Sequence, residues 1–247
     1  MTNNTILITG GTGAIGTALC RRFHADGFAV VANCHPSDSD RSERGIMALR
    51  DEGVAVELMP FDVTDASACE RAIADIETRV GPLDVIVNAA GITRDAVLSK
   101  LEPEAWSAVL STNLDGVYNV TRPGIVGMTS RGYGRVVNIS SVNGQRGQLG
   151  QTNYSAAKAG MTGFTRALAR EVARDGITVN SVSPGYVRSP MIEAIPEAVR
   201  TKVVKQIPVG RFAEPEEIAH AVAFLASRDS GYVTGADLSV NGGYHIG

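Results

Sequence analysis

Short apolar runs rich in β-branched residues alternate with longer segments of helical periodicity along the whole chain. Several of these runs are almost continuously apolar, as in strands that are covered on both faces of a parallel sheet. Strands separated by helices of about ten or more residues form right-handed βαβ units. The alternation therefore predicts an α/β fold with a single doubly wound domain, residues 1–247, in which about seven parallel strands carry helices on both faces.

The limits of the expected elements follow from the same pattern. Strands are expected at 5–9, 28–34, 54–63, 83–89, 134–142, 177–184 and 236–243. Helices are expected near 15–26, 41–52, 66–80, 103–128, 153–175, 191–205 and 215–227. In a doubly wound sheet, ligands bind at the carboxyl ends of the strands, where the strand order reverses. The segment 186–212 interrupts the alternation before the last strand, and it is either a substrate lid or an additional packing helix.

The charge and the cysteines narrow the class of protein. With a formal net charge of −3, the chain has no basic field for nucleic acid or an anionic membrane surface. It has no apolar run near the roughly 20 residues of a membrane span, and its first residues lack the regions of a signal peptide. Cys20, Cys34 and Cys69 lie outside any CxxC or metal-ligand spacing. We therefore expect a cytoplasmic protein with reduced thiols and no bound metal.

The stretch "TGGTGAIG", residues 9–16, directly follows the first expected strand and opens a helix. Glycine lets the backbone turn sharply and approach a pyrophosphate, and the free N–H groups of a helix N-terminus attract the anion. A GxGxxG spacing begins at Gly11, and a Gly-x-x-x-Gly/Ala-x-Gly spacing begins at Gly10. Either spacing predicts a dinucleotide site.

The end of the second strand, in "VVANCHPSDSDR", bears on the choice of nicotinamide cofactor. An NAD site usually has Asp or Glu here, bonded to the adenosine ribose. This strand ends in Asn33, Cys34 and His35 instead. Arg41, and with it Ser37, follows closely enough to reach a 2′-phosphate. The segment therefore predicts a preference for NADPH.

Tyr154 and Lys158 lie four residues apart in "NYSAAKAG", on one face of an expected helix. An ammonium beside a phenol lowers the phenol pKa from about 10, which suits proton exchange with a carbonyl oxygen. A solvated surface pair is the ordinary alternative. Ser141, at the end of the fifth expected strand, can hydrogen-bond a substrate oxygen in the same crevice. Asn113 lies inside a long expected helix, where Asn is unfavourable, and a partner in the crevice explains its presence.

Together these segments resemble the short-chain dehydrogenase/reductase family, which has a Rossmann-type fold. The matching pieces occur in the family's order, namely "TGGTGAIG", "NAAG" at 88–91, Asn113, Ser141, Tyr154, Lys158 and "PGYVRSPM" at 184–191. The resemblance selects the spacing that begins at Gly10. It implies that Tyr154 donates a proton to the substrate, while Lys158 holds the nicotinamide ribose and lowers the pKa of the tyrosine. It further implies that Ser141 orients the carbonyl and that Asn113 holds a water.

The resemblance also implies the remaining contacts. The cofactor-binding residues would be Gly10, Thr12, Gly13, Ala14, Ile15, Gly16, His35, Arg41, Asp62, Val63, Asn88, Ala89, Ala90, Gly91, Tyr154, Lys158, Pro184, Gly185, Val187 and Ser189. The substrate-binding residues would be Asp95, Ser141, Gln148, Gln151, Tyr154, Gly185 and Tyr186. Among these positions Asn88 is expected closest to the ribose. Ser189 stands where the family often has Thr and keeps the hydroxyl.

Within the family, "NAAGITRD", "VNISSVNGQRGQLGQTNYS" and the final "NGGYHIG" resemble the reductases that act on acetoacetyl-CoA in polyhydroxyalkanoate synthesis. The resemblance implies an NADPH-dependent reductase forming (R)-3-hydroxybutanoyl-CoA, a step of polyhydroxybutyrate synthesis, and a homotetramer. A 3-oxoacyl-[acyl-carrier-protein] reductase of fatty-acid synthesis is the alternative, because only the carrier differs. A dinucleotide-binding regulator without catalysis is the other class, and a complete proton relay argues against it.

Overall fold

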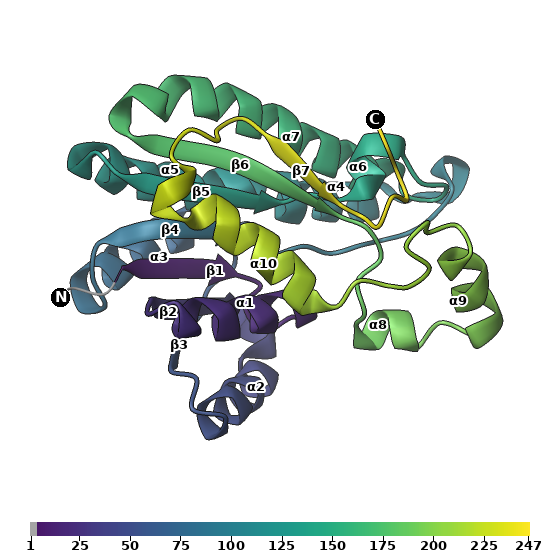
Figure 1. Cartoon of the computed structure of the whole chain (residues 1–247), viewed down its shortest axis with the longest axis horizontal. Helices are drawn as coiled ribbons and strands as arrows, with labels where there is room; N and C mark the ends of the chain where they lie inside the picture. The colour runs from purple at the N-terminus through teal and green to yellow at the C-terminus, as the bar shows by residue number, and fades with distance from the viewer. Residues whose placement is uncertain (1–3) are drawn as a thin grey trace.

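The computed structural model describes residues 4–247 and contains one seven-stranded parallel sheet, ordered β3-β2-β1-β4-β5-β6-β7 (Figure 1). The strands are β1 Thr5–Thr9, β2 Ala29–Cys34, β3 Val56–Pro60, β4 Leu83–Asn88, β5 Gly134–Ile139, β6 Ile177–Pro184 and β7 Asp237–Val240. The helices are α1 Ala14–Ala25, α2 Ser39–Asp51, α3 Ala66–Arg79, α4 Pro103–Leu110, α5 Gly116–Arg131, α6 Val142–Arg146, α7 Thr152–Val172, α8 Pro190–Glu193, α9 Glu197–Val204 and α10 Pro215–Ala226. The predicted doubly wound α/β fold is confirmed.

Two apolar layers hold the sheet between its helices. Ile6 and Ile8 of β1 pack on the side of α1, α2 and α10, whereas Leu7 packs on the side of α3, α5 and α7. Successive side chains of a strand point to opposite faces, so one short strand supplies both layers. All three side chains are fully buried. Each such burial is worth about 1.5–3 kcal/mol relative to exposure, which explains why the strands read as continuous apolar runs.

The strand order reverses between β1 and β4. From β1 the chain moves outward to β2 and β3, then returns to pair β4 with the other side of β1. At the carboxyl end of this pair, Thr9 lies beside Asn88. The loops that follow these two strands, beginning at Gly10 and Ala89, therefore diverge around the crevice in which a doubly wound sheet binds its ligands.

Several expected elements have different limits in the structure, and the strand expected at 54–63 covers only Val56–Pro60. The fifth strand ends at Ile139, because Ser141 accepts a hydrogen bond from the N–H of Asn143 and starts α6. The long helix expected at 103–128 contains a π-helical turn, Ser111–Asp115, between α4 and α5. The helix expected at 191–205 is split into α8 and α9. Pro196 precedes α9, and the residue before a proline is disfavoured in helical conformation.

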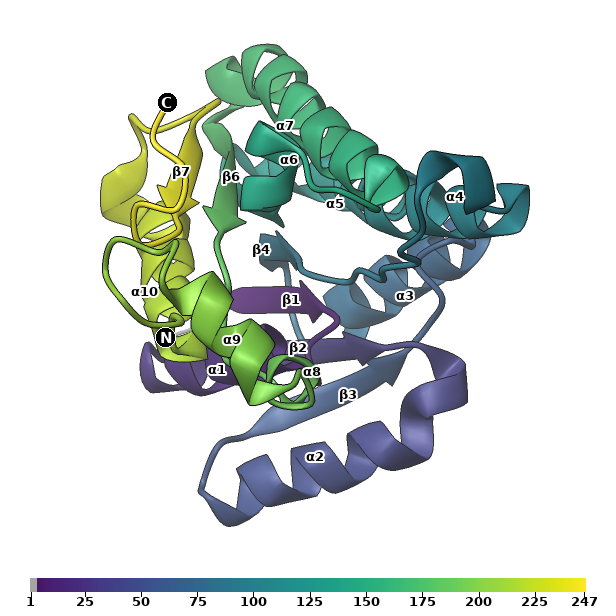
Figure 2. The ribbon, with the colours of Figure 1, turned by 90° about the vertical axis from the view of Figure 1, so that its right-hand side faces the viewer.

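The segment between β6 and α10 stands apart from the regular layers. Figure 1 shows α8 and α9 beyond the ends of the strands, and Figure 2 turns this side of the molecule toward the viewer, with both helices in front. This is the segment for which the sequence left open a lid or a packing helix. Among the residues that the structure describes, no helix is both long and apolar enough to cross a membrane.

Candidate active site

The turn between β1 and α1 is crowded enough to require glycine. Gly10 has φ +62°, and a Cβ there would lie 2.9 Å from Ala90 Cα. A Cβ on Gly16 would overlap the carbonyl oxygen of Gly10. No side chain caps α1 at Gly13, so the first N–H groups of the helix face outward without a side-chain acceptor. This tight glycine turn at an uncapped helix N-terminus fits a pyrophosphate.

Two buried polar side chains hold this turn in place. Asn33 Oδ1 accepts a hydrogen bond from Gly10 N at 3.3 Å, and its Nδ2 donates to the carbonyl oxygen of Phe61 at 2.8 Å. Thr9 Oγ1 accepts from the N–H of Ala89 at 3.0 Å, which joins the ends of β1 and β4. Sequence reasoning missed both roles. The available signal was a polar residue at the end of an otherwise apolar strand.

The residues expected at the adenosine end of the cofactor lie around the carboxyl end of β2. His35 Nε2 is 3.4 Å from Asp62 Oδ2, which joins β2 to the loop after β3. Thr12 Oγ1 is 3.1 Å from Ser42 Oγ, which joins the turn to α2. Arg41 is exposed beside Ser42. The structure thus brings His35 to Asp62 and Thr12 to Ser42, which the sequence did not single out.

Two of the residues expected to contact the cofactor, Asn88 and Val63, are buried. The side chain of Asn88 is 1% exposed, and its Nδ2 donates to Thr121 Oγ1 at 3.0 Å and to Asn138 Oδ1 at 2.8 Å. Val63 is buried in the core against Gly116 of α5. The Asn88 amide therefore braces β4 against β5 and α5, and it is Ala89 and Gly91 of the same loop that reach the cavity.

A cavity of about 330 Å³ opens at the carboxyl edge of the sheet. Twelve expected residues line it, namely Ile15, Ala89, Gly91, Ser141, Gln151, Tyr154, Lys158, Pro184, Gly185, Tyr186, Val187 and Ser189. The sequence did not single out the other lining residues, Ile92, Thr93, Ile139, Ser140, Val142, Asn143 and Ile192. Ile192 belongs to α8, so the segment after β6 supplies part of the cavity wall.

Tyr154 and Lys158 both lie in this cavity wall rather than as a solvated surface pair, Lys158 buried and Tyr154 half-buried. Burial raises the pKa of the Tyr154 phenol, and the hydrogen bond with the Ser141 hydroxyl acts in the opposite direction without cancelling that rise. Burial also lowers the pKa of the Lys158 ammonium to about 8. Lys158 Nζ donates to the carbonyl oxygen of Ile139 at 2.7 Å and lies 5.7 Å from the centre of the Tyr154 ring.

The raised pKa of Tyr154 differs from the lowered pKa that the sequence predicted. The desolvation of the phenolate outweighs the hydrogen bond from Ser141, and Asp95 adds a further small rise. The structure consequently presents a neutral phenol at neutral pH, with a hydroxyl group beside it and a buried ammonium nearby. A neutral phenol is the protonation state that a proton donor needs.

Asn113 lies at the centre of the π-helical turn and is fully buried. Its Oδ1 accepts from Ile92 N at 2.8 Å, and its Nδ2 donates to the Ile92 carbonyl oxygen at 2.9 Å. A Cβ on Gly91 would lie 3.1 Å from Asn113 Oδ1 and 3.7 Å from Lys158 Nζ, so these groups converge on one point. The sequence left open a water or a backbone partner for this amide, and its observed partners are the backbone groups of Ile92; the water that the family resemblance implies stays a prediction.

A chain of amides links the expected substrate contacts to Ser141. Gln151 Nε2 donates to Asp95 Oδ2 at 2.8 Å, and Asn143 Nδ2 donates to Gln151 Oε1 at 3.0 Å. The N–H of Asn143 in turn donates to Ser141 Oγ at 3.1 Å. Because a carboxylate only accepts, Asp95 orients both amides along this chain. Gln148 lies apart from it, in a neighbouring groove.

The cavity, the Tyr154 phenol in its wall and the glycine turn at the start of α1 together fit an oxidoreductase that depends on a nicotinamide dinucleotide. A family model described as Enoyl-(Acyl carrier protein) reductase matches residues 11–245. The chain belongs to the short-chain dehydrogenase/reductase family.

Curated relatives match over almost the whole chain. It is 53% identical over 237 residues to an acetoacetyl-CoA reductase of Allochromatium vinosum, with 96% of each chain covered. It is 51% identical over 247 residues to an acetoacetyl-CoA reductase of Cupriavidus necator, with 100% of each covered. A 3-oxoacyl-[acyl-carrier-protein] reductase of Haemophilus influenzae is 41% identical over 241 residues, with 97% of each covered.

Proposed function

We propose that this protein uses NADPH to reduce acetoacetyl-CoA to (R)-3-hydroxybutanoyl-CoA, a step of polyhydroxybutyrate synthesis. The observation that carries the proposal is the half-buried Tyr154 phenol beside Ser141, in a cavity whose wall includes Ile15 of the first turn of α1. The similarity of about 50% identity to proteins named acetoacetyl-CoA reductase supports the choice of substrate over that of other family members.

The chain's own residues divide the work of the reduction. NADPH, when bound, supplies a hydride to the carbonyl carbon. Tyr154 donates the proton to the carbonyl oxygen, so that hydride and proton together complete the alcohol. The Ser141 hydroxyl donates a hydrogen bond to the same oxygen and stabilises the charge that develops on it. Lys158 holds the nicotinamide ribose. Asn113 fixes the loop at Ile92 through two hydrogen bonds with the backbone of that residue.

The preference for NADPH rests on the end of β2, which carries Asn33, Cys34 and His35 rather than a carboxylate. Exposed Arg41, on the helix that follows, pairs with the 2′-phosphate. The remaining cofactor contacts are those named from the sequence, with the backbone rather than the side chain of Asn88 facing the ribose. A comparison of kcat/KM for NADPH and NADH tests this, and a clear preference for NADH would reject it.

On the substrate side, Gln151, held by Asp95, orients the acetoacetyl group, and Gly185 and Tyr186 line the same cavity. The segment 186–212 acts as a lid of the single domain 1–247, since Tyr186, Val187 and Ile192 line the cavity. The 3-oxoacyl-[acyl-carrier-protein] reductase remains the second candidate. Kinetics with both thioesters separate the two, and activity confined to the carrier-protein substrate would reject the first.

We further propose that the enzyme is a cytoplasmic homotetramer that binds neither nucleic acid nor membranes. Its three cysteines are free and buried, which suits a reducing compartment. The exposed apolar residues Tyr118 and Val126 of α5 are available to a second copy of the chain. Light scattering of the purified protein is expected to give four chains per particle, and a monomer would contradict the proposal.

A further inference from the structure

Asn143, the second residue of α6, lines the cavity together with Gln151 and Tyr154. Its side-chain Nδ2 donates a hydrogen bond to Gln151 Oε1 at 3.0 Å. Gln151 Nε2 in turn donates to Asp95 Oδ2 at 2.8 Å, so the Gln151 amide is held at both its oxygen and its nitrogen. Asn143 therefore supplies one of the two bonds that fix the Gln151 side chain in the cavity wall.

The direction of these bonds is set by Asp95. An ionised carboxylate has no proton to donate, so Asp95 accepts and Gln151 must turn its Nε2 toward it. Gln151 Oε1 is then left facing Asn143, which must turn its Nδ2 toward that oxygen. If either amide turned over alone, two acceptors would face each other. The three side chains thus have one mutually consistent arrangement.

This arrangement leaves one buried polar atom without a partner. Among residues 4–247, no group donates a hydrogen bond to Asn143 Oδ1, which is itself buried. A buried acceptor without a donor lowers the stability of a fold, and an apolar side chain of similar size would avoid that loss. Stability alone therefore does not account for an amide at position 143, whereas its hold on Gln151 does.

The backbone that carries this amide is fixed beside the reacting groups. The N–H of Asn143 donates to Ser141 Oγ at 3.1 Å, at the start of α6. The next residue, Gly144, lies so close to α7 that a Cβ there would be 2.9 Å from the carbonyl carbon of Lys158. Because Gly144 has no side chain, α6 lies directly against α7. This contact fixes the point from which the Asn143 amide reaches Gln151.

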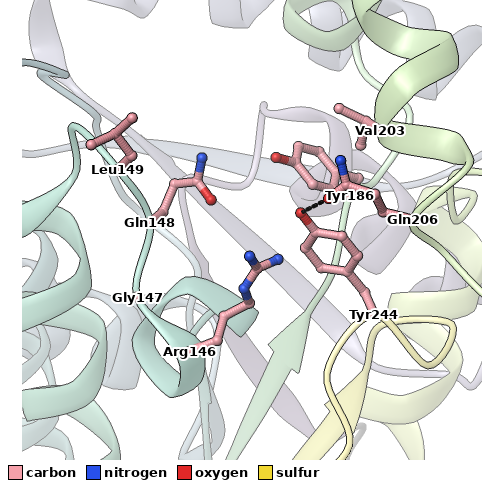
Figure 3. A pocket seen from close by; sticks show the side chains of 8 residues that line it. All are labelled: Arg146, Gly147, Gln148, Leu149, Tyr186, Val203, Gln206 and Tyr244. Atoms are coloured by element: carbon pink, nitrogen blue, oxygen red, sulfur yellow. Dashed lines mark hydrogen bonds between the residues drawn. The ribbon is translucent and has the colours of Figure 1, made fainter.

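Gln148, the other glutamine expected at the substrate, is not held in this way. Figure 3 shows its amide pointing into the neighbouring groove, on the wall opposite Gln206. The chain that runs from Asp95 through Gln151 to Asn143 does not include it. Of these two glutamines, Gln151 is the one that the chain orients before a ligand binds.

We propose that Asn143 is a positioning residue for the reduction and that it acts through Gln151. It holds the Gln151 amide in the orientation that Asp95 requires, so that a 3-oxoacyl thioester meets a preformed contact. Less conformational freedom is then lost when the substrate binds. This inference rests on the proposed function, in which Gln151 orients the acetoacetyl group.

The first test is Asn143→Leu, which keeps the approximate size of the side chain and removes both its donor and its unpaired acceptor. The KM for acetoacetyl-CoA is expected to rise about tenfold. The value of kcat should stay within about threefold of the wild type, because the backbone N–H that bonds Ser141 remains. The midpoint of thermal unfolding should change by less than about 3 °C, since an unpaired acceptor is lost together with the bond.

Asn143→Ala is made in parallel, because it removes the same groups without adding apolar volume to the cavity wall. It should show the same rise in KM, about tenfold, with kcat similarly preserved. A KM within about twofold of the wild type in both variants, or a fall in kcat with KM unchanged, would overturn the proposal.

A double-mutant cycle decides whether Asn143 acts through Gln151. In Gln151→Ala the contact is already lost, so adding Asn143→Leu is expected to raise KM by less than about twofold more. A second rise of about tenfold in that background would show that Asn143 acts by another route, and the positioning role would be refuted.

Gln145→Met is the matched control on the same helix. Gln145 Nε2 donates to Asp237 Oδ2 at 2.8 Å and to Ser239 Oγ at 2.9 Å, so its amide faces β7. In the part of the chain that the structure describes, its Oε1 is also buried without a donor. The control should keep KM and kcat within about twofold of the wild type. A rise in KM equal to that of Asn143→Leu would mean that any change in α6 disturbs the site, which would contradict the proposal.

The wild-type enzyme tests the proposed function separately. If it does not reduce acetoacetyl-CoA, the reductase is rejected. If it does, and the KM of Asn143→Leu and Asn143→Ala is unchanged, the positioning role is rejected and the reductase is kept.

Discussion

Two regions adjoin one cavity, the turn at residues 9–16 and the catalytic corner formed by Ser141, Tyr154 and Lys158. They are built from different parts of the chain. At the turn, Gly10 and Gly16 are required because a Cβ on either would collide with neighbouring backbone atoms, and no side chain caps the first N–H groups of α1. At the corner, the pKa values of the Tyr154 and Lys158 side chains are set by burial, and the Ser141 hydroxyl lies beside Tyr154. The comparison predicts that the turn loses cofactor affinity when a side chain is added, whereas the corner loses catalytic rate when a functional group is removed.

The largest expected effect comes from removing a single oxygen at the corner. Tyr154→Phe keeps the ring in the cavity wall and eliminates the proton donor, so kcat for acetoacetyl-CoA should fall about 10³-fold. Titration with NADPH should give an unchanged dissociation constant, because the turn is intact. Turnover comparable to the wild type would leave the corner without a chemical role.

At the turn, the corresponding change adds one methyl group. Gly10→Ala places a Cβ 2.9 Å from Ala90 Cα at a φ of +62°, and the affinity for NADPH should fall about 100-fold. Gly27→Ala is the matched control: its φ is +83°, with no atom within 4 Å of the added Cβ. The control should lose some stability to backbone strain but keep its cofactor affinity. Equal losses of affinity in both variants would show that strain, not crowding, matters.

The pH dependence tests whether the corner relies on a buried charge. Lys158 has a pKa of about 8 in the free enzyme, lowered by burial, so it is charged below that pH and loses its charge as the pH rises through it. The value of kcat/KM for NADPH should therefore fall about tenfold per pH unit above this pKa. In Lys158→Arg, the residual activity should not show this decline, because a guanidinium stays charged. A wild-type profile that stays level for about two units above the pKa would contradict the assignment.

The smallest expected effect concerns a side chain in the cofactor half of the site. Arg41→Ala should raise KM for NADPH about fivefold and leave KM for NADH unchanged, because an exposed guanidinium is partly screened by solvent. Arg44→Ala, also exposed on α2, is the control and should change neither value. Parallel changes for both cofactors in Arg41→Ala would mean that Arg41 does not recognise the 2′-phosphate.

The sequence predicted the fold and most of the cavity, because strand periodicity and the spacing of Gly10 to Gly16 are local patterns. It missed Asn33 and Asn143, since their roles depend on partners that are distant in sequence or belong to a loop whose shape is not a local property. The enclosure of the Asn88 side chain between neighbouring strands was also not predictable from the sequence, which only indicated that Asn88 lies closest to the ribose.

The direction in which the pKa of Tyr154 shifts could not be predicted from the sequence, for a related reason. Helical spacing shows that Lys158 shares a face with Tyr154, but the degree of burial, which decides the balance, follows from tertiary packing. The π-helical turn at Asn113 is similar, because its register is stabilised by Ile92, which lies 21 residues away in the chain.

Steady-state kinetics of the purified wild-type protein with acetoacetyl-CoA and NADPH test the central claim most directly. The account predicts saturable oxidation of NADPH with formation of (R)-3-hydroxybutanoyl-CoA, and a lower kcat/KM when NADH replaces NADPH. The absence of turnover above the rate without enzyme, or formation of the opposite enantiomer, would contradict it.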